Sequence, residues 1–177
     1  NLAPINYYGY SKLLIENHIK MLSRIDDLRY VILRPSNVYG KYQRADSKQG
    51  FISVAIGKMR SNQVVEIWGD GITTRDYVDV SDVAMVVYRI ITNNLQNKIF
   101  NIGSGKGHSL VTVVQLLEKY LDRPANVIYK EKRKVDVDKI VLDISNLQSC
   151  IKYKPKKLDV GIKDFISNIL KAKPYEK

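Results

Sequence analysis

The sequence predicts an α/β fold, and two features of the 177-residue chain carry this prediction. Segments whose apolar residues recur at helical spacing alternate with short runs of consecutive apolar residues. The first pattern indicates an amphipathic helix and the second a buried strand. Helices that alternate with buried strands are typical of a mostly parallel sheet covered by helices. With 45% hydrophobic and 27% charged residues, the chain has the composition of a soluble globular domain.

The first elements follow from local patterns. Residues 8–25 carry apolar side chains at helical spacing, while Glu16, Lys20 and Arg24 mark a more solvent-exposed side. This pattern predicts an amphipathic helix. The apolar run at residues 30–33 predicts a buried strand. A loop over residues 36–50, a helix over 51–60 and a strand over 64–68 are expected next, in this order.

The second half of the chain continues the alternation. Residues 75–80 alternate polar and apolar side chains, as a half-buried strand does. Ser81 is the predicted N-cap of a helix over residues 82–92, because a serine hydroxyl can accept a hydrogen bond from a free N–H at a helix start. The remaining expectations are a strand over residues 99–102, a helix over 111–121 capped by Ser109, a strand over 127–129 and a helix over 160–170.

The predicted order opens with a helix rather than with the strand, Gly-rich loop and helix that begin a doubly wound sheet. The glycines at residues 103–107 do not have the Gly-x-Gly-x-x-Gly spacing of a dinucleotide-binding loop. We therefore expect residues 1–177 to form a single, incomplete structural unit whose strands would join a larger sheet.

The formal net charge of +11 raises the question of nucleic-acid binding, because Lys and Arg neutralise phosphates. Most of the lysines are scattered, and only residues 130–134 and 152–157 form short basic clusters. Neither cluster has the aromatic interleaving of a surface that binds single strands. We expect no nucleic-acid partner, although the positive field favours an anionic substrate.

Other classes are also disfavoured. No stretch approaches the roughly 20 apolar residues of a membrane span, so no membrane partner is expected. The single Cys150 cannot form an internal disulfide and fits a reducing compartment, which predicts a cytoplasmic location. His18 and His108 lie far apart without further candidate ligands, so no metal site is expected.

The pair Tyr8 and Lys12 is the sharpest chemical signal. Residues four apart on a helix lie on one face, with their Cβ atoms about 5–6 Å apart. A free tyrosine has a pKa of about 10 and is a poor base near neutral pH, and a neighbouring ammonium favours the phenolate. The pattern therefore suits a group that moves a proton on or off a hydroxyl.

Three further blocks follow this pair in order. They are Arg-Pro-Ser-Asn-Val-Tyr-Gly at residues 34–40, Gly-Asp-Gly with Arg-Asp-Tyr-Val inside residues 69–84, and Phe-Asn-Ile-Gly-Ser-Gly at 100–105. Together with Tyr-x-x-x-Lys, the blocks resemble extended short-chain dehydrogenases/reductases that act on sugar nucleotides, the NAD-dependent epimerase/dehydratase family of UDP-glucose 4-epimerase type. The resemblance runs from Tyr8 to about Leu170.

The resemblance implies a C-terminal part of a Rossmann-type NAD-binding fold plus a small α/β subdomain that binds the substrate. Residues 1–40 and 76–105 are expected to belong to the Rossmann part, and residues 41–75 and 106–177 to the subdomain. In the family, the helix expected at residues 8–25 lies in a dimeric four-helix bundle. The implied partner is a second copy of the chain, joined through this helix or through the exposed edge of the truncated sheet.

The resemblance also assigns roles at the NAD site. Tyr8 would be the catalytic acid/base, while Lys12 would hold the nicotinamide ribose and favour the phenolate of Tyr8. Pro35, Ser36 and Val38 belong to the loop that passes the nicotinamide.

Further positions match those that bind the sugar nucleotide. Asn37 would reach the substrate diphosphate, and Arg75 would pair with it, because a planar guanidinium donates two hydrogen bonds to phosphate oxygens. Arg133 is implied as a second phosphate contact and Asp136 as a ribose contact. Ile140 stands where some epimerases carry a bulky Tyr, which predicts room for an N-acetylated hexose.

The implied function is that of an NAD-dependent enzyme that epimerises UDP-hexoses or UDP-N-acetylhexosamines by transient oxidation at C4, with a role in carbohydrate metabolism such as polysaccharide biosynthesis. A nucleotide-sugar 4,6-dehydratase, decarboxylase or reductase shares the Tyr8–Lys12 pair, and a non-catalytic sugar-nucleotide module is a further alternative. In the family, the catalytic Ser/Thr and the dinucleotide fingerprint lie upstream of Tyr8. The sequence therefore leaves NAD and NADP open, and the 177 residues alone are expected to be inactive.

Overall fold

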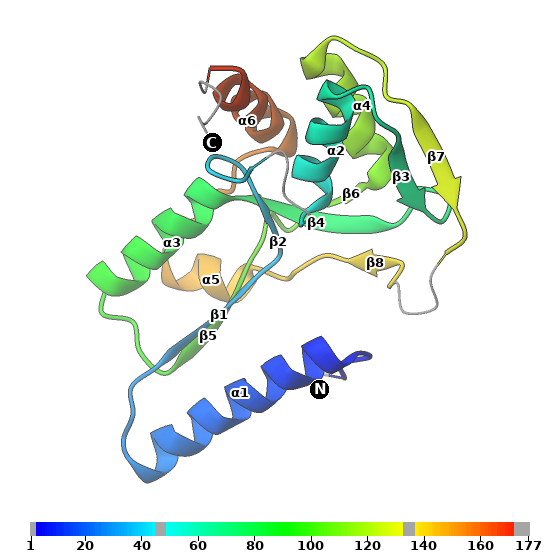
Figure 1. Ribbon diagram of the computed structural model, residues 1–177. Coiled ribbons are helices and arrows are strands. Elements are labelled where there is room, and N and C mark those ends of the chain that lie inside the picture. The colour runs from blue at the N-terminus through cyan, green and yellow to red at the C-terminus, as the bar shows by residue number, and fades with distance from the viewer. Residues whose placement is uncertain (1–2, 45–48, 133–136, 172–177) are drawn as a thin grey trace, which may run out of the picture.

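The computed structural model describes residues 3–44, 49–132 and 137–171. Helices alternate with strands along the chain, as expected for an α/β fold (Figure 1). The elements are α1 (Tyr7–Ile25), β1 (Val31–Pro35), β2 (Asn37–Tyr39), α2 (Phe51–Arg60), β3 (Val65–Trp68), β4 (Thr74–Asp79), α3 (Val80–Thr92), β5 (Lys98–Ile102), β6 (Gly107–Ser109), α4 (Leu110–Leu121), β7 (Val127–Lys130), β8 (Lys139–Ile140), α5 (Ser145–Cys150) and α6 (Leu158–Lys171).

The strands pair mostly in parallel, in three small sheets. β1 pairs with β5, and Arg34 is the register partner of Asn101. β3 pairs with β7. β4 is the centre of the third sheet: β2 runs parallel to its second half, while antiparallel β6 and parallel β8 flank its first half. Arg75 consequently lies between His108 on β6 and Ile140 on β8.

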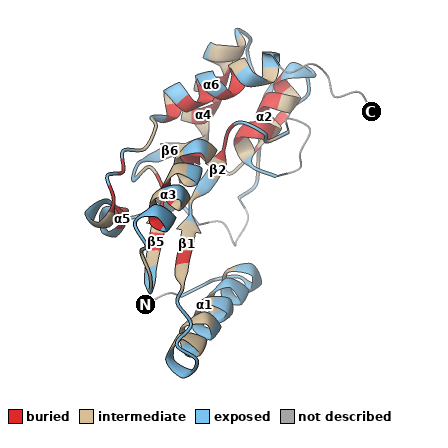
Figure 2. Cartoon of the chain, turned by 90° about the vertical axis from the view of Figure 1, so that its left-hand side faces the viewer, coloured by how far each residue is buried: buried red, intermediate tan, exposed pale blue. Residues whose placement is uncertain are grey.

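Two hydrophobic clusters form the core. One packs α3 and α5 against β5, with Val86, Phe100 and Leu147 fully buried. The other packs α2, α4 and α6 together, with Ile56 and Leu117 fully buried at its centre. Buried residues are conspicuous on these helices in Figure 2. The division of the chain into a Rossmann part and a substrate-binding part stays a prediction.

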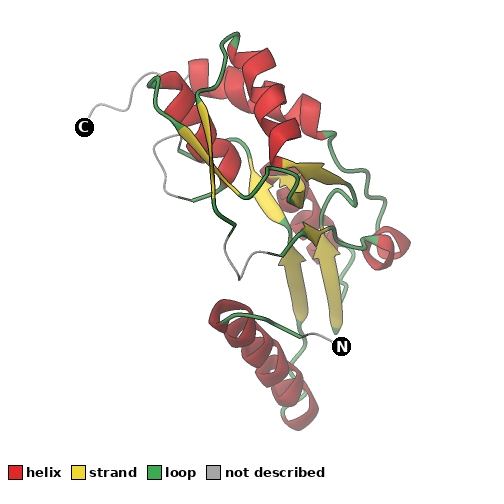
Figure 3. Ribbon diagram, turned by 90° about the vertical axis from the view of Figure 1, so that its right-hand side faces the viewer, coloured by secondary structure: helices red, strands yellow, loops and turns green. Residues whose placement is uncertain are grey.

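Helix α1 differs from the other long helices because none of its 19 residues is buried. It lies below the β1–β5 pair in Figures 1 and 3, apart from the helices that surround the two clusters. Within the described ranges, no helix combines the length and the apolar character that crossing a bilayer requires.

The predicted cap of α3 is wrong. The helix begins at Val80, so the capping position falls on Asp79, whose carboxylate accepts a hydrogen bond from the Ser81 N–H at 2.8 Å. Ser81 already lies in the first turn and donates its hydroxyl to the same carboxylate. The predicted cap of α4 is confirmed, because the Ser109 hydroxyl accepts from the Thr112 N–H at 3.1 Å.

The helices and strands expected from periodicity are confirmed within a few residues, whereas the patterns do not predict four short elements. The expected loop over residues 36–50 contains the strand β2, which pairs with β4 and is separated from β1 by Ser36 alone. The strands β6 and β8 have three and two residues, and helix α5 has six. Segments this short show no recognisable period.

Candidate functional site

A cleft of about 680 Å³ opens where α1, the β2–β4 pair, α2 and β3 meet. This volume lies within the range of small-molecule sites. Four predicted site residues line the cleft: Tyr8, Asn37, Val38 and Arg75. The other lining residues are Tyr39, Gln43, Gln49, Gly50, Phe51, Ile52, Glu66, Trp68, Thr73, Tyr77 and Leu110.

Tyr8 and Lys12 lie on one face of α1, as their spacing predicts. The helix starts at Tyr7, and its N-cap Asn6 accepts a hydrogen bond from the Gly9 N–H at 2.8 Å, which places Tyr8 in the first turn. The Lys12 ammonium lies 5.3 Å from the centre of the Tyr8 ring, within the range of a cation–π contact. The Tyr8 side chain is 73% exposed at the edge of the cleft, so its phenol is accessible to a ligand.

Two other tyrosines that line the cleft are poorly suited to exchange protons. Burial raises the pKa of Tyr77 to about 12. Burial also raises the pKa of Tyr39, and the carboxylate of Asp79 adds to that increase. Both phenols therefore stay protonated near neutral pH. Of the three tyrosines that line the cleft, only Tyr8 combines exposure with a neighbouring ammonium.

The start of β2 and the residue before it are fixed to neighbouring strands by two hydrogen bonds. The Ser36 N–H donates to the carbonyl of Ile102 at 2.8 Å, and the Asn37 amide donates to the carbonyl of Asp76 at 2.8 Å. The Ser36 hydroxyl oxygen is buried and has no hydrogen-bond partner among the described residues. A buried polar atom without a hydrogen-bond partner costs about 1–3 kcal/mol.

Arg75, on β4, lines the cleft. Its Nη1 donates to the carbonyl of Val137 at 2.6 Å and to that of Thr74 at 3.0 Å. No described residue accepts a hydrogen bond from its Nε or Nη2. One nitrogen thus anchors the side chain, while the rest of the planar fork can donate to an anion.

Asp76 has a structural role. Its side chain is completely buried and accepts hydrogen bonds from the Ser104 hydroxyl and N–H, at 2.6 and 2.8 Å, and from the Gly105 N–H at 3.1 Å. It also accepts from the Leu142 N–H at 3.3 Å. This carboxylate therefore fixes two loops beside the strand that carries Arg75.

The remaining predicted site residues are not part of the cleft lining. Lys12, Pro35 and Ser36 lie in the segments that flank it, on α1 and at the end of β1. Ile140 is 39% exposed on β8, where it is the register partner of Arg75. Arg133 and Asp136 lie outside the described residues.

The sequence patterns miss two side chains on β3. Burial alternates along this strand, so that Glu66 and Trp68 share the face that lines the cleft. Lys130, on the paired strand β7, lies 2.7 Å from the Glu66 carboxylate and 5.2 Å from the centre of the Trp68 ring. The signal for both residues is the alternation of the strand, because residues two apart face the same side.

The NAD dependent epimerase/dehydratase family matches residues 1–103, more than half of the chain. The chain belongs to this family. The match includes Tyr8, Lys12, Asn37 and Arg75, and the predicted family is thereby confirmed.

Two relatives and one solved structure illustrate where the chain lies within the epimerase/dehydratase family. A putative UDP-glucose 4-epimerase of Methanocaldococcus jannaschii is 38% identical over 96% of the chain and 53% of its own length. The dTDP-4-dehydro-6-deoxyglucose reductase of Escherichia coli is 30% identical over 95% of the chain and 54% of its own length. The UDP-glucose 4-epimerase of Thermotoga maritima, solved with UDP-glucose, is 32% identical with a TM-score of 0.88, over 96% of the chain and 55% of that chain.

These matches confirm the predicted α/β, Rossmann-like fold of the epimerase/dehydratase family. The chain spans about half the length of the curated relatives it matches. The relatives include epimerases and a reductase that act on nucleotide sugars, in agreement with the predicted class of activity.

Proposed function

We propose that the protein that carries this chain is an NAD-dependent nucleotide-sugar epimerase that inverts C4 of a UDP-hexose or UDP-N-acetylhexosamine. The observation that carries this proposal is the exposed Tyr8 phenol beside the Lys12 ammonium, at the edge of a cleft that also contains Arg75. A pure binding module has no need for an acid/base group, which favours an enzyme over the non-catalytic alternative.

Each of these groups has a separate task. Tyr8 accepts the proton of the C4 hydroxyl and later returns it. The Lys12 ammonium lies beside the ring of this phenol. Arg75 and Asn37 hold the diphosphate, so that the nucleotide stays anchored while the sugar turns. By resemblance, Arg133 and Asp136 add a phosphate and a ribose contact.

The residues around Tyr8 fit the nicotinamide end of NAD. The Ser36 hydroxyl is buried without a partner among the described residues, between Pro35 at the end of β1 and the strand β2 that carries Val38. Ser36 and Lys12 would hold the nicotinamide and its ribose. NAD supplies the two-electron oxidation at C4 and its reversal, while the chain supplies orientation and the proton acceptor.

We further propose that a second copy of the chain covers α1. The helix has no buried residue and exposes several large apolar side chains. They are Tyr7, Tyr10, Leu14, Ile15, Met21 and Ile25. Pairing of the two helices would remove this surface from water, which is the main driving force of such association. The alternative site for association of two copies is the second edge of β1, because β1 pairs only with β5 in the described part of the chain.

Turnover assays of the complete gene product test the function. Incubation with UDP-glucose or UDP-N-acetylglucosamine and catalytic NAD should give the C4 epimer without net reduction of NAD. Net consumption of a reduced cofactor would instead identify a reductase, the activity of the Escherichia coli relative. Loss of water from the sugar would identify a dehydratase. Binding without turnover would contradict an enzyme, and the isolated 177 residues are expected to show no turnover.

A further inference from the structure

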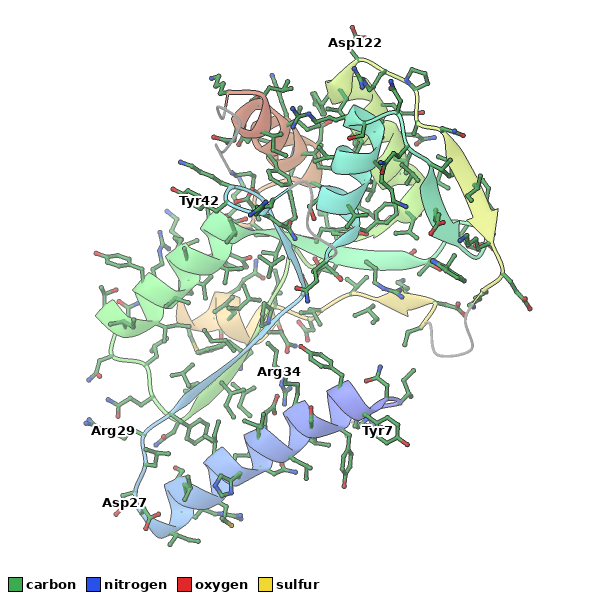
Figure 4. The ribbon with its side chains drawn as sticks, viewed as in Figure 1. Tyr7, Asp27, Arg29, Arg34, Tyr42 and Asp122 are labelled. Carbon is green, nitrogen blue, oxygen red and sulfur yellow. The ribbon has the colours of Figure 1, made fainter. Side chains whose placement is uncertain are left out.

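Helix α1 is joined to the sheet by one ion pair. The Arg34 Nε donates to Glu16 Oε1 at 2.7 Å, and its Nη2 donates to Oε2 of the same carboxylate. In Figure 4 the Arg34 side chain extends from β1 toward α1. Two parallel hydrogen bonds fix both the distance and the angle between the groups, which a single contact does not do.

No other side-chain hydrogen bond joins α1 to a strand within the described ranges. The helix has no buried residue either, so packing within this chain contributes little to its position. The pair is shielded, with the Glu16 side chain 13% exposed and that of Arg34 29%. The hydrogen bond from Arg34 lowers the pKa of Glu16, and the same bond raises the pKa of Arg34.

Both ends of the pair adjoin the groups assigned to chemistry. Glu16 follows Tyr8 and Lys12 at a spacing of four residues, so all three lie along one face of α1. Arg34 immediately precedes the segment at residues 35–38. That segment is held rigidly, because β1 pairs with β5 and the Ser36 N–H donates to Ile102.

Resting on the proposed function, we infer that Glu16 and Arg34 form a positioning pair that sets the Tyr8–Lys12 face of α1 against the segment that carries Ser36 and Asn37. Neither side chain lines the cleft, so the pair acts through the groups that it places. Misplacement of a reacting group by about 1 Å can cost on the order of 100-fold in rate. Arg75 and its anchor at Val137 lie on other elements and do not depend on the pair.

Glu16→Gln and Arg34→Lys variants of the complete gene product test this inference. Both substitutions nearly keep the size of the side chain. Arg34→Lys also keeps the positive charge but removes the planar guanidinium that donates two hydrogen bonds. We expect kcat to fall at least tenfold in each variant, with KM for the sugar nucleotide unchanged within twofold. The double variant should be no slower than the slower single variant, because both changes break the same contact.

Lys119→Gln is the matched control. It removes an exposed ion pair, Lys119 with Asp159 at 3.1 Å, that joins α4 to α6 away from the cleft. The control should keep kcat and KM. Unchanged kcat in Glu16→Gln and Arg34→Lys, or a KM that rises in step with a falling kcat, would overturn the positioning role.

Amide hydrogen exchange gives a readout that needs no turnover. Exchange along residues 7–25 should be faster in both variants than in the parent, while residues 51–60 and 110–121 keep their protection. If α1 exchanged at the same rate in the variants and in the parent, the positioning role would be overturned, whether or not the parent turns over a sugar nucleotide. A parent without turnover would count separately against the proposed function.

Discussion

The Lys12 ammonium lies 5.3 Å from the centre of the Tyr8 ring, one helical turn away on the same face of α1. Under the proposed function, Tyr8 transfers the proton rather than Tyr39 or Tyr77, because burial raises the pKa of both of those phenols. Replacement of Tyr8 by Phe should therefore lower kcat of the complete gene product by 10²–10⁴-fold, the usual contribution of a general acid/base. Binding of UDP should change less than threefold.

Steady-state kinetics and a UDP titration measure the two effects of Tyr8→Phe separately. The control is Tyr88→Phe, because Tyr88 is 67% exposed on α3 and does not line the cleft. Equal losses in both variants would show that the phenol of Tyr8 has no special role.

Arg75→Lys should weaken UDP binding about tenfold, or roughly 1.4 kcal/mol, because an ammonium keeps the charge but loses the planar fork. Calorimetric titration with UDP measures this loss. Arg24→Lys, at an exposed position in the last turn of α1, should bind UDP as the parent does. Parent-like affinity in Arg75→Lys would remove Arg75 from the diphosphate site.

Ile140 is the register partner of Arg75 on β8. By resemblance, it stands where some epimerases carry a bulky Tyr, so we propose that a larger side chain here would narrow the space for the sugar. We expect the parent to accept UDP-N-acetylglucosamine as well as UDP-glucose. Ile140→Tyr should lower kcat/KM for UDP-N-acetylglucosamine at least tenfold relative to kcat/KM for UDP-glucose. The reason is that a steric clash of this size costs about 1–3 kcal/mol. Ile91→Tyr, on the exposed side of α3, is the control. Strict preference of the parent for UDP-glucose would contradict the assignment.

The raised pKa of Tyr77 predicts a loss of stability in alkali. An unfolded tyrosine ionises near pH 10, whereas the folded Tyr77 stays protonated until about pH 12. The neutral Tyr77 phenol thus contributes fully to the free energy of unfolding below pH 10. This contribution declines as the pH rises toward 12, by up to about 3 kcal/mol. Urea unfolding between pH 9 and 11, a range that avoids chemical damage, measures this effect. The free energy of unfolding should fall less with pH in Tyr77→Phe than in the parent chain. Tyr88→Phe, at a 67% exposed site, should behave like the parent.

The exposed apolar side of α1 predicts association through this helix. Leu14→Lys should shift the complete gene product from dimer to monomer in sedimentation velocity, because a charge replaces a half-exposed apolar side chain at the proposed contact. Leu170→Lys, which changes a similarly exposed leucine on α6, should leave the dimer intact. A monomeric parent would contradict the proposed pairing, and a dimer that survives Leu14→Lys would favour the edge of β1.

Local patterns in the sequence were sufficient for the long helices, the main strands, the Ser109 cap and the shared face of Tyr8 and Lys12. These features depend on residues a few positions apart, and the helical and strand periods place such residues relative to one another. The four motif blocks also indicated the family, since their order and spacing reflect one architecture.

Tertiary structure alone decided the remaining features, because each depends on residues distant in sequence. The short strand β2 exists because β4 pairs with it, and Asp76 is structural because loops at residues 104 and 142 converge on its carboxylate. Glu16 and Arg34 meet across 18 positions. No local period encodes such contacts; the packing of strands and helices creates them, together with the burial that raises the pKa of Tyr77.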